Sequence, residues 1–199
     1  MFFLIAAAAA AAAAAAVAVP TPPSAPASLP SPQRRQELLF DAATLGRTDL
    51  IAPLIAAGAD VNGRDPRGFT PIILASYNGH LETTEALIAA KGDACLPDRD
   101  QGNTAQMGVA FKGDDRIAAR LLKAGCDVDA RNHAGQTALM MAALFGRTAQ
   151  IDMLIAAGAD RTAVDAAGRS AAAVAAAQGN AAVVTQLRDG RPTPSAPHR

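Results

Sequence analysis

Short apolar segments alternate with short polar turns along most of this chain. A representative segment is LETTEALI at residues 81–88, whose apolar positions fall on one face of a helix. The stretches between such segments are rich in Asp, Asn and Gly, as in GADVN at residues 58–62, a composition that suits a tight turn. The pattern therefore predicts an all-α chain of short helices joined by projecting turns.

Glycine recurs along the chain in three parallel series. The series are Gly46, Gly79, Gly113, Gly146 and Gly179; Gly58, Gly92, Gly125 and Gly158; and Gly68, Gly102, Gly135 and Gly168. Within each series the interval is 33 or 34 residues. A constant period of this length indicates one supersecondary unit repeated about five times, which buries its apolar face only by stacking on its copies into a solenoid. The longer interval in the second series places one extra residue near Lys91.

Each unit carries signals for two helices. The first helix follows a Thr or Ser whose hydroxyl can accept a hydrogen bond from a backbone N–H of the first turn: Thr70, Thr104, Thr137 and Ser170. Pro71 stands at the first helical position, which needs no N–H donor. The Gly46 series ends the first helix, since glycine readily adopts the left-handed conformation found there. The predicted units are residues 37–65, 66–98, 99–131, 132–164 and 165–190, within a domain of residues 35–190.

These motifs resemble the ankyrin repeat family. The similarity rests on GFTPIILA at residues 68–75, NGHLE at residues 78–82 and Gly-Ala-Asp at residues 58–60 and 158–160. It covers about 155 of the 199 residues and implies an all-α ankyrin-repeat solenoid of about five stacked helix-turn-helix repeats. The third repeat departs most from the pattern. Gln106 takes a normally apolar position there, and Gly108 lies within a helix, where glycine costs about 1 kcal/mol relative to alanine.

The resemblance also implies where a partner would bind. Ankyrin repeats contact partner proteins through their turn tips and the concave face of their first helices. In this chain the corresponding positions are Arg67, Phe69, Tyr77, Asn78, Gln101, Asn103, Phe111, Lys112, His133, Gln136, Leu144, Phe145 and Arg169. Four of the five aromatic residues after residue 19 belong to this set, and aromatic side chains are frequent binding anchors. The alternative is that these rings pack on neighbouring repeats and only seal the stack.

The two ends of the chain differ in composition from the repeats. Residues 1–18 are uncharged and contain eleven consecutive alanines, which is typical of a cleaved signal peptide although no Lys or Arg precedes the run. A retained membrane anchor, or a low-complexity stretch without a targeting role, fits the same residues. Residues 19–34 and 191–199 are proline-rich and predict a disordered linker and a disordered tail. We expect a bacterial protein that is periplasmic or secreted, with an inner-membrane anchor as the alternative.

The two cysteines, Cys95 and Cys126, lie in turn segments of neighbouring repeats. In an exported chain they can form a disulfide. They do not occupy equivalent positions, however, and a disulfide needs Cα atoms about 4.4–6.8 Å apart, which is less than the spacing between repeats. Two separate buried thiols are therefore favoured, with the disulfide as the alternative.

Charge and composition argue against several other functions. The 18 basic and 18 acidic residues balance, and both signs alternate along the predicted turn tips, so no basic surface for nucleic acid is expected. The three histidines form no metal-ligand spacing, and no phosphate-binding loop or serine-nucleophile motif occurs. We expect a monomeric, non-catalytic scaffold without cofactor, whose partner is another protein. A membrane-tethered accessory protein, which requires that residues 1–18 are retained, and an inhibitor of a single enzyme are the alternatives.

Overall fold

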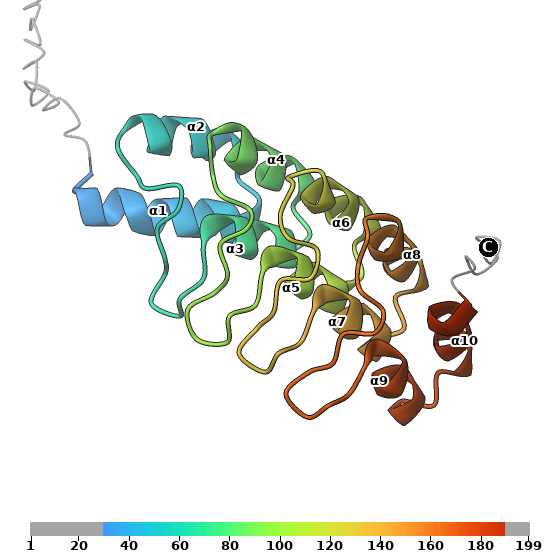
Figure 1. The fold of residues 1–199 in the computed structure, drawn as a ribbon. Helices are drawn as coiled ribbons and strands as arrows, with labels where there is room; N and C mark the ends of the chain where they lie inside the picture. Colours follow the sequence, from blue (N-terminus) through green and yellow to red (C-terminus); the bar gives the residue numbers. More distant parts are fainter. Residues whose placement is uncertain (1–29, 190–199) are drawn as a thin grey trace, which may run out of the picture.

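The computed structural model describes residues 30–189, which form five pairs of α-helices (Figure 1). The helices are α1 (Pro32–Leu45), α2 (Thr48–Ala56), α3 (Pro71–Tyr77), α4 (Leu81–Ala89), α5 (Ala105–Lys112), α6 (Asp115–Leu122), α7 (Ala138–Leu144), α8 (Thr148–Ala156), α9 (Ala171–Ala177) and α10 (Ala181–Asp189). This part of the chain forms no strand, only one isolated bridge between Val164 and Ser170. The predicted all-α solenoid of five helix-turn-helix repeats is confirmed.

The odd- and even-numbered helices form two parallel rows (Figure 1). The first helix of each pair packs on the first helix of the next pair, and the second helices stack beside them in the other row. The loops that join one pair to the next extend away from both rows, and we call them fingers: residues 57–70, 90–104, 123–137 and 157–170. The fingers and the odd-numbered helices together form what we call the inner face.

The predicted helix caps are all present. The hydroxyls of Thr70, Thr104, Thr137 and Ser170 each accept a hydrogen bond from the backbone N–H three residues later, at 3.3–3.4 Å. The glycines of the Gly46 series have φ between 66° and 88° at the ends of the odd-numbered helices. Local sequence signals therefore set the bounds of these helices, as expected from capping chemistry.

The ends of the odd-numbered helices are also contacted from the next repeat. His80 Nε2 lies 3.0 Å from the carbonyl oxygen of Thr44, and Arg147 Nη2 donates to the carbonyl of Phe111 at 2.8 Å. These contacts satisfy carbonyl groups that a helix end leaves without partners. The His80 ring also fills the space beside Gly46, where an added Cβ would lie 2.6 Å from Nδ1. Gly46 is therefore required both by its conformation and by its neighbour.

An Asp or Asn at the base of each finger organises the tip. The buried carboxylate of Asp165 accepts hydrogen bonds from the backbone N–H groups of Ala167 and Arg169, both at 2.9 Å. The equivalent residues of the other fingers make bonds of the same kind: Asp65, Asp98 and Asn132. Each finger tip is thus organised by hydrogen bonds within its own sequence.

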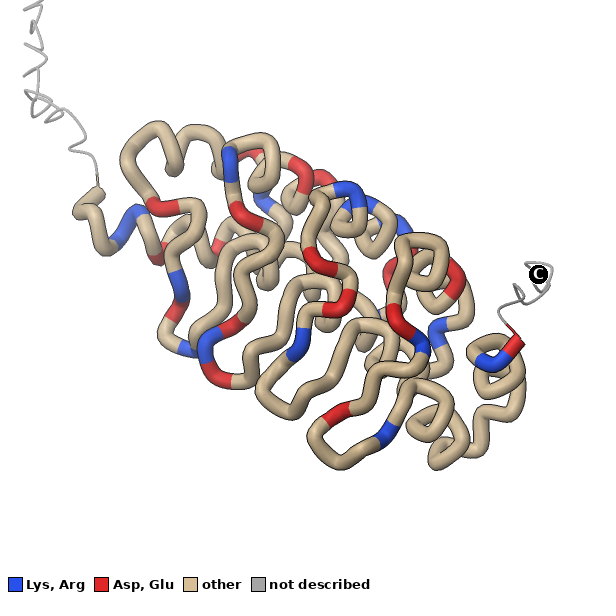
Figure 2. The backbone as a smooth tube through the Cα atoms, viewed as in Figure 1, with Lys and Arg blue, Asp and Glu red and all other residues tan. Residues whose placement is uncertain are grey.

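Neighbouring fingers are joined to one another by hydrogen bonds. Backbone N–H groups pair Arg99 with the carbonyl of Gly68, His133 with that of Gln101 and Ala166 with that of Ala134. The guanidinium groups of Arg64 and Arg131 reach carbonyls of the next finger, at Pro97 and Val164. Other finger arginines pair with nearby carboxylates, and Figure 2 shows both signs of charge mixed along these loops. This edge is a mixed-charge surface.

Apolar side chains fill the space between the two rows. The largest fully buried ones include Leu39, Ile51, Ile72, Leu87, Ile117, Leu139 and Leu154. They form two clusters, one mainly over the first three repeats and the other over the last three. Helix α5 contributes to both, with Val109 in the first cluster and Met107 in the second. Each repeat is therefore buried by its neighbours rather than by itself.

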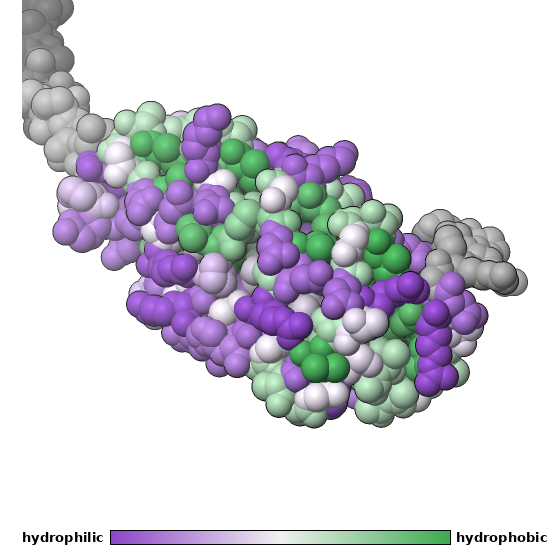
Figure 3. Space-filling model, viewed as in Figure 1, coloured by the Kyte–Doolittle hydropathy of each residue, from purple (hydrophilic) through white to green (hydrophobic). Residues whose placement is uncertain are grey.

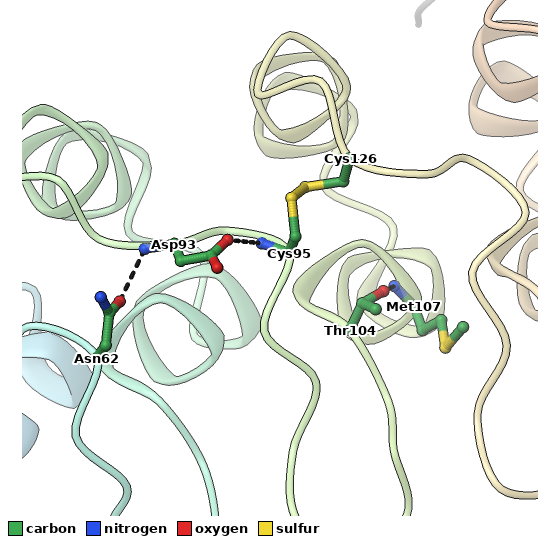
Figure 4. Close-up of a disulfide and its surroundings, with 6 residues drawn as sticks. All are labelled: Asn62, Asp93, Cys95, Thr104, Met107 and Cys126. Atoms are coloured by element: carbon green, nitrogen blue, oxygen red, sulfur yellow. Dashed lines mark hydrogen bonds between the residues drawn. A yellow bond between two sulfur atoms is a disulfide. The ribbon is translucent and has the colours of Figure 1, made fainter.

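A line of contacts links the starts of successive fingers, and a disulfide forms part of it (Figure 4). The Asn62 side chain accepts a hydrogen bond from the N–H of Asp93 at 2.8 Å. Two repeats later, the Asp129 side chain accepts an equivalent bond from the N–H of Asp160 at 2.9 Å. Between these two contacts, the residue equivalent to Asn62 is a cysteine.

Cys95 is this residue, and it is bonded to Cys126 with Cα atoms 5.3 Å apart. The structure thus has the disulfide and not the separate thiols that the sequence favoured. Residues in equivalent positions are a full repeat apart, whereas Cys95 lies at the end of its turn and faces the start of the next one. A covalent bond replaces the polar contact at this junction.

The junction crossed by the disulfide has two packing defects. A cavity of about 110 Å³ lies between the disulfide and helices α5 and α6. Gln106 borders it, and both polar atoms of the Gln106 amide are buried without a hydrogen-bond partner. A buried polar group left unsatisfied costs about 1–3 kcal/mol. The disulfide therefore holds a junction that packing alone stabilises weakly.

The irregular interval of the repeat lies elsewhere than predicted. Lys91 has a φ of 69° and takes the left-handed position that Gly58 holds one repeat earlier, so no residue is inserted beside it. The insertion lies at the tip of the second finger. There the N–H of Asp98 bonds to the carbonyl of Asn103, five residues on, whereas the equivalent bond spans four residues in the other fingers. Alignment on glycines failed because lysine adopts the glycine conformation at this turn.

The first helix begins earlier than predicted. Helix α1 starts at Pro32, inside the residues 19–34 assigned to the linker, and Ser31 accepts a hydrogen bond from the N–H of Arg34 at 3.2 Å. Ser followed by Pro is here a helix start, since proline fits the first helical position. The predicted signal peptide (1–18) and tail (191–199) lie outside the described residues. No helix between residues 30 and 189 is long and apolar enough to cross a membrane.

Reduction of the disulfide is expected to destabilise the solenoid by about 3–4 kcal/mol, because the bond closes a loop of 31 residues and restricts the unfolded chain. Urea unfolding of the oxidised and reduced protein, followed by circular dichroism, measures the difference. The control is the double variant Cys95→Ser, Cys126→Ser, whose midpoint should not respond to reductant. Equal midpoints for the two forms of the wild type would contradict the role assigned to the bond.

The last finger is expected to weaken in acid. Hydrogen bonds from the backbone N–H of Arg169 and then from its guanidinium hold the pKa of Asp165 below its usual range. A carboxylate with a lowered folded pKa stabilises the fold above its unfolded value of about 3.9, and this contribution is lost as pH falls through the folded pKa.

Asp165→Asn should make thermal stability less dependent on pH below about 4, since the unfolded carboxylate titrates there. The amide keeps the backbone bonds, as Asn132 does at the equivalent position. Thermal unfolding at a series of pH values measures this, and parallel curves for wild type and variant would show that Asp165 carries no such linkage.

Candidate functional site

A groove of about 480 Å³ runs along the inner face between α3 and α5. Finger residues form one end, and the C-terminal ends of the two helices form the other. Six of the predicted partner-facing residues line it: Arg67, Phe69, Tyr77, Asn78, Asn103 and Phe111. The sequence therefore located most of the polar and aromatic side chains of this groove, because their positions follow directly from the repeat period.

Three aromatic side chains form a continuous stack along this face. The ring centroids of Tyr77 and Phe111 are 6.0 Å apart with planes 15° from parallel, and Phe145 meets Phe111 edge-on at 4.7 Å. Each ring remains 37–40% exposed. The rings thus contact neighbouring repeats and still leave more than a third of their surface in water. Such contacts hold each ring in a fixed orientation.

Two cations lie on aromatic rings beside the groove. Lys112 Nζ is 4.6 Å from the centre of the Tyr77 ring, and the Arg67 guanidinium is 5.1 Å from the centre of the Phe69 ring. Arg67 also pairs with Asp65 at 3.0 Å, whereas Lys112 forms no ion pair among residues 30–189. Cation–π contacts of this kind restrict the rings further.

Asp98 is the buried charge at the finger end of the groove. Its carboxylate accepts hydrogen bonds from the backbone N–H groups of Gln101 at 2.6 Å, Gly102 at 3.2 Å and Asn103 at 3.0 Å. Asp98 and Arg67 are the charged residues that line the groove; Asp98 is buried and bonded within its finger, whereas Arg67 pairs with Asp65 and keeps an exposed side chain. The groove therefore presents apolar surface, neutral amides and one exposed guanidinium to a ligand.

Three of the other predicted residues take part in finger contacts. His133 Nδ1 lies 3.1 Å from the carbonyl oxygen of Asp100, which joins two fingers. Gln136 accepts a hydrogen bond from a neighbouring asparagine at 3.1 Å, and Arg169 pairs with Asp165 at 2.8 Å. These side chains serve the fold, and any part they have in binding stays a prediction.

The remaining predicted residues border the inner face. Gln101 and Lys112 are exposed, Leu144 is half-buried, and Phe145 closes the aromatic stack. Two further carboxylates have a pKa lowered by hydrogen bonds, Asp49 at the start of α2 and Asp160 in a finger, and neither lines the groove. No three His, Cys, Asp or Glu side chains of the described residues gather as a metal site.

Gly108 is one of the groove residues that the sequence did not assign to the site. It holds the fourth position of α5, where α3 has Leu74 and α7 has Met141. The missing side chain leaves a hollow in the wall of the groove. An added Cβ would meet only Tyr77, at a normal contact distance of 3.4 Å. The signal was present in the sequence, as a glycine aligned with large apolar residues.

Known proteins share the repeats of this chain. It is 33% identical over 105 residues to the ankyrin repeat and KH domain-containing protein mask-1 of Caenorhabditis elegans, covering 52% of this chain and 4% of that protein. It is 34% identical over 96 residues to ankyrin repeat domain-containing protein 63 of Mus musculus, covering 46% and 24%. It is 27% identical over 142 residues to the mitochondrial disaggregase of Bos taurus, covering 54% and 21%. The chain spans a quarter or less of each relative.

A family model described as ankyrin repeats in three copies matches residues 39–132 and again residues 106–194. Together the two matches cover all ten helices except the first residues of α1. The caps, the left-handed glycines and the fingers repeat with the same period. This chain belongs to the ankyrin repeat family.

Proposed function

We propose that this protein is a non-catalytic scaffold that binds another protein through the inner face of repeats two to four. Ankyrin repeats in general mediate protein–protein contacts and are typically not enzymes. The observation that carries the proposal is the stack of Tyr77, Phe111 and Phe145, which stays 37–40% exposed beside the groove. Clustered apolar surface of this kind is unfavourable in water and is frequent at binding sites.

The surroundings of the stack suit a protein interface. Figure 3 shows hydrophilic residues over the first fingers and more apolar surface over the last one. Exposed side chains such as Gln101 and Lys112 can form a polar rim around the aromatic anchors, as interfaces commonly do. The fingers and rings are already held by contacts between repeats, so a partner would meet a preformed surface and little ordering would oppose binding.

We also propose that the protein is exported to the periplasm or secreted. The Cys95–Cys126 disulfide supports this, because disulfides persist in oxidising compartments and are rare in the cytosol. The uncharged, alanine-rich residues 1–18 support it independently. If that segment is retained, the repeats are instead tethered to the inner membrane.

Replacing Tyr77, Phe111 and Phe145 together with alanine should reduce partner affinity by at least about 100-fold, because each anchor contributes more than 1 kcal/mol at a typical interface. Affinity capture from the envelope fraction of the native host identifies the partner, and titration of the purified pair gives the affinity. Tyr77 is the single tyrosine in a chain without tryptophan, so its fluorescence reports on the groove directly.

The matched control is Val164→Ala, which removes an exposed apolar side chain from the last finger. Circular dichroism shows whether the triple variant keeps its helices. Unchanged affinity in a folded triple variant would refute binding through this face, and loss of the fold would show that the rings only seal the stack.

Protein isolated from its native cells is expected to begin near Val19 and to contain no free thiol. N-terminal sequencing and thiol titration of the denatured protein, with and without reductant, measure both properties. An intact residue 1 together with membrane association would support the tethered alternative, and two free thiols would argue against export.

A further inference from the structure

We propose that the hollow at Gly108 is a subsite for one uncharged apolar side chain from an extended peptide segment of the partner. This inference rests on the proposed function and specifies what the groove recognises. The helix position of Gly108, the apolar side chains around it and the free amide groups at the two ends of the groove support it, and each is a separate observation.

Gly108 weakens the helix that contains it, since glycine is a poor helix former. Both neighbouring repeats place a large apolar side chain at the same position, Leu74 and Met141. The packing leaves room for a methyl group at this position, because the nearest atom from another helix, Tyr77 Cδ2, would lie 3.4 Å from an added Cβ. Because Gly108 has no side chain, space opens next to Met107 and Met141. The flexible thioethers of these two residues can adapt to an inserted group. A ligand side chain of the size of leucine would take the place of the apolar side chain that the third repeat lacks here.

Two asparagines offer hydrogen bonds to a peptide backbone. Asn78 Nδ2 donates to the carbonyl of Leu74 at 2.8 Å, and its Oδ1 forms no hydrogen bond within residues 30–189. Asn103 is the reverse: its Oδ1 accepts from Asn132 at 2.9 Å, and its Nδ2 forms no bond in the same range. One acceptor and one donor match the N–H and C=O groups of a peptide.

The two asparagines lie at opposite ends of the groove. Asn103 precedes α5, and Asn78 follows α3, whose length is about 10 Å at 1.5 Å per residue. An extended chain covers that distance with about three residues. A short segment could therefore bond to both amides and place its central side chain over Gly108.

The surroundings of Gly108 disfavour a charged side chain at this position. Asp98 is buried and accepts three N–H groups of its own finger, and the cations nearby, Arg67 and Lys112, are held on the Phe69 and Tyr77 rings. A carboxylate or ammonium placed in the hollow would lose hydration against the apolar side chains of Leu74, Met107 and Met141. Apart from two threonines and the two asparagines, the rest of the lining is apolar or aromatic, so an aliphatic side chain is the occupant that fits.

Blocked tripeptides test the subsite in the full-length protein. Acetyl-Ala-Leu-Ala-amide should bind in the millimolar range, as expected for a ligand of this size, and should shift the NMR methyl signals of Met107 and Met141. Acetyl-Ala-Glu-Ala-amide should bind at least tenfold more weakly. No response to the leucine peptide, or an equal response to both peptides, would overturn the proposal.

Two substitutions then fill the hollow. Gly108→Leu gives the third repeat the side chain that the second repeat has at this position, Leu74. This substitution should weaken binding of the leucine peptide at least tenfold. Gly108→Ala should raise the thermal midpoint by roughly 2–4 °C through helix propensity and weaken the peptide by a smaller factor. The control is Ala176→Leu, on the exposed side of α9. If Gly108→Leu does not fold, Gly108→Ala decides: a higher midpoint with unchanged affinity means that the glycine is only a tolerated defect.

Partner capture separates the two levels of the proposal. If the aromatic variants lose the partner but both Gly108 variants keep wild-type affinity, the inner face binds and the subsite is rejected. If the wild type binds the leucine peptide but the aromatic variants keep the partner, the subsite exists and the proposed partner surface is wrong.

Discussion

Contact between neighbouring repeats is the interaction on which the whole structure depends. The helices have only 7–14 residues, and isolated helices of that length are marginal in water. Each becomes stable because its apolar side chains are buried by the repeats on either side, as Val109 and Met107 of α5 show by joining two different clusters. Hydrogen bonds also orient neighbouring repeats relative to one another. Some join adjacent fingers, and others run from one repeat to the helix end of the previous repeat.

The third repeat shows what happens when this stacking is imperfect. Its helix α5 contains a glycine, and Gln106 leaves buried polar atoms without partners. The disulfide crosses the junction on one side of α5, and the groove opens on the other; Thr104 and Met107 border both. A covalent bond at the turn can compensate for packing that a hollow on the inner face removes. Stability and the candidate binding surface are therefore coupled through one short helix.

Much of the fold was predictable because it follows from local chemistry. The Thr and Ser caps and the left-handed glycines act within a few residues of themselves, so the bounds of α3, α5, α7 and α9 follow from the sequence. Predictions failed where a residue behaved unlike its type. Lys91 adopts a left-handed conformation, and Pro32 starts a helix although it stands in a proline-rich stretch. Composition and glycine alignment cannot detect such exceptions.

By itself, the sequence determined the repeat period, the fold and the side of the solenoid on which the aromatic residues lie, because periodicity projects equivalent positions onto one face. Tertiary structure decided which of them meet. Cys95 and Cys126 are bonded, and His133 bridges two fingers, because residues offset within the repeat can be closer across a junction than equivalent ones. The hollow lies between Leu74 and Tyr77 of the second repeat, Gly108 of the third and Met141 of the fourth, so three repeats form it. Space between repeats depends on how side chains pack, and no single segment encodes it.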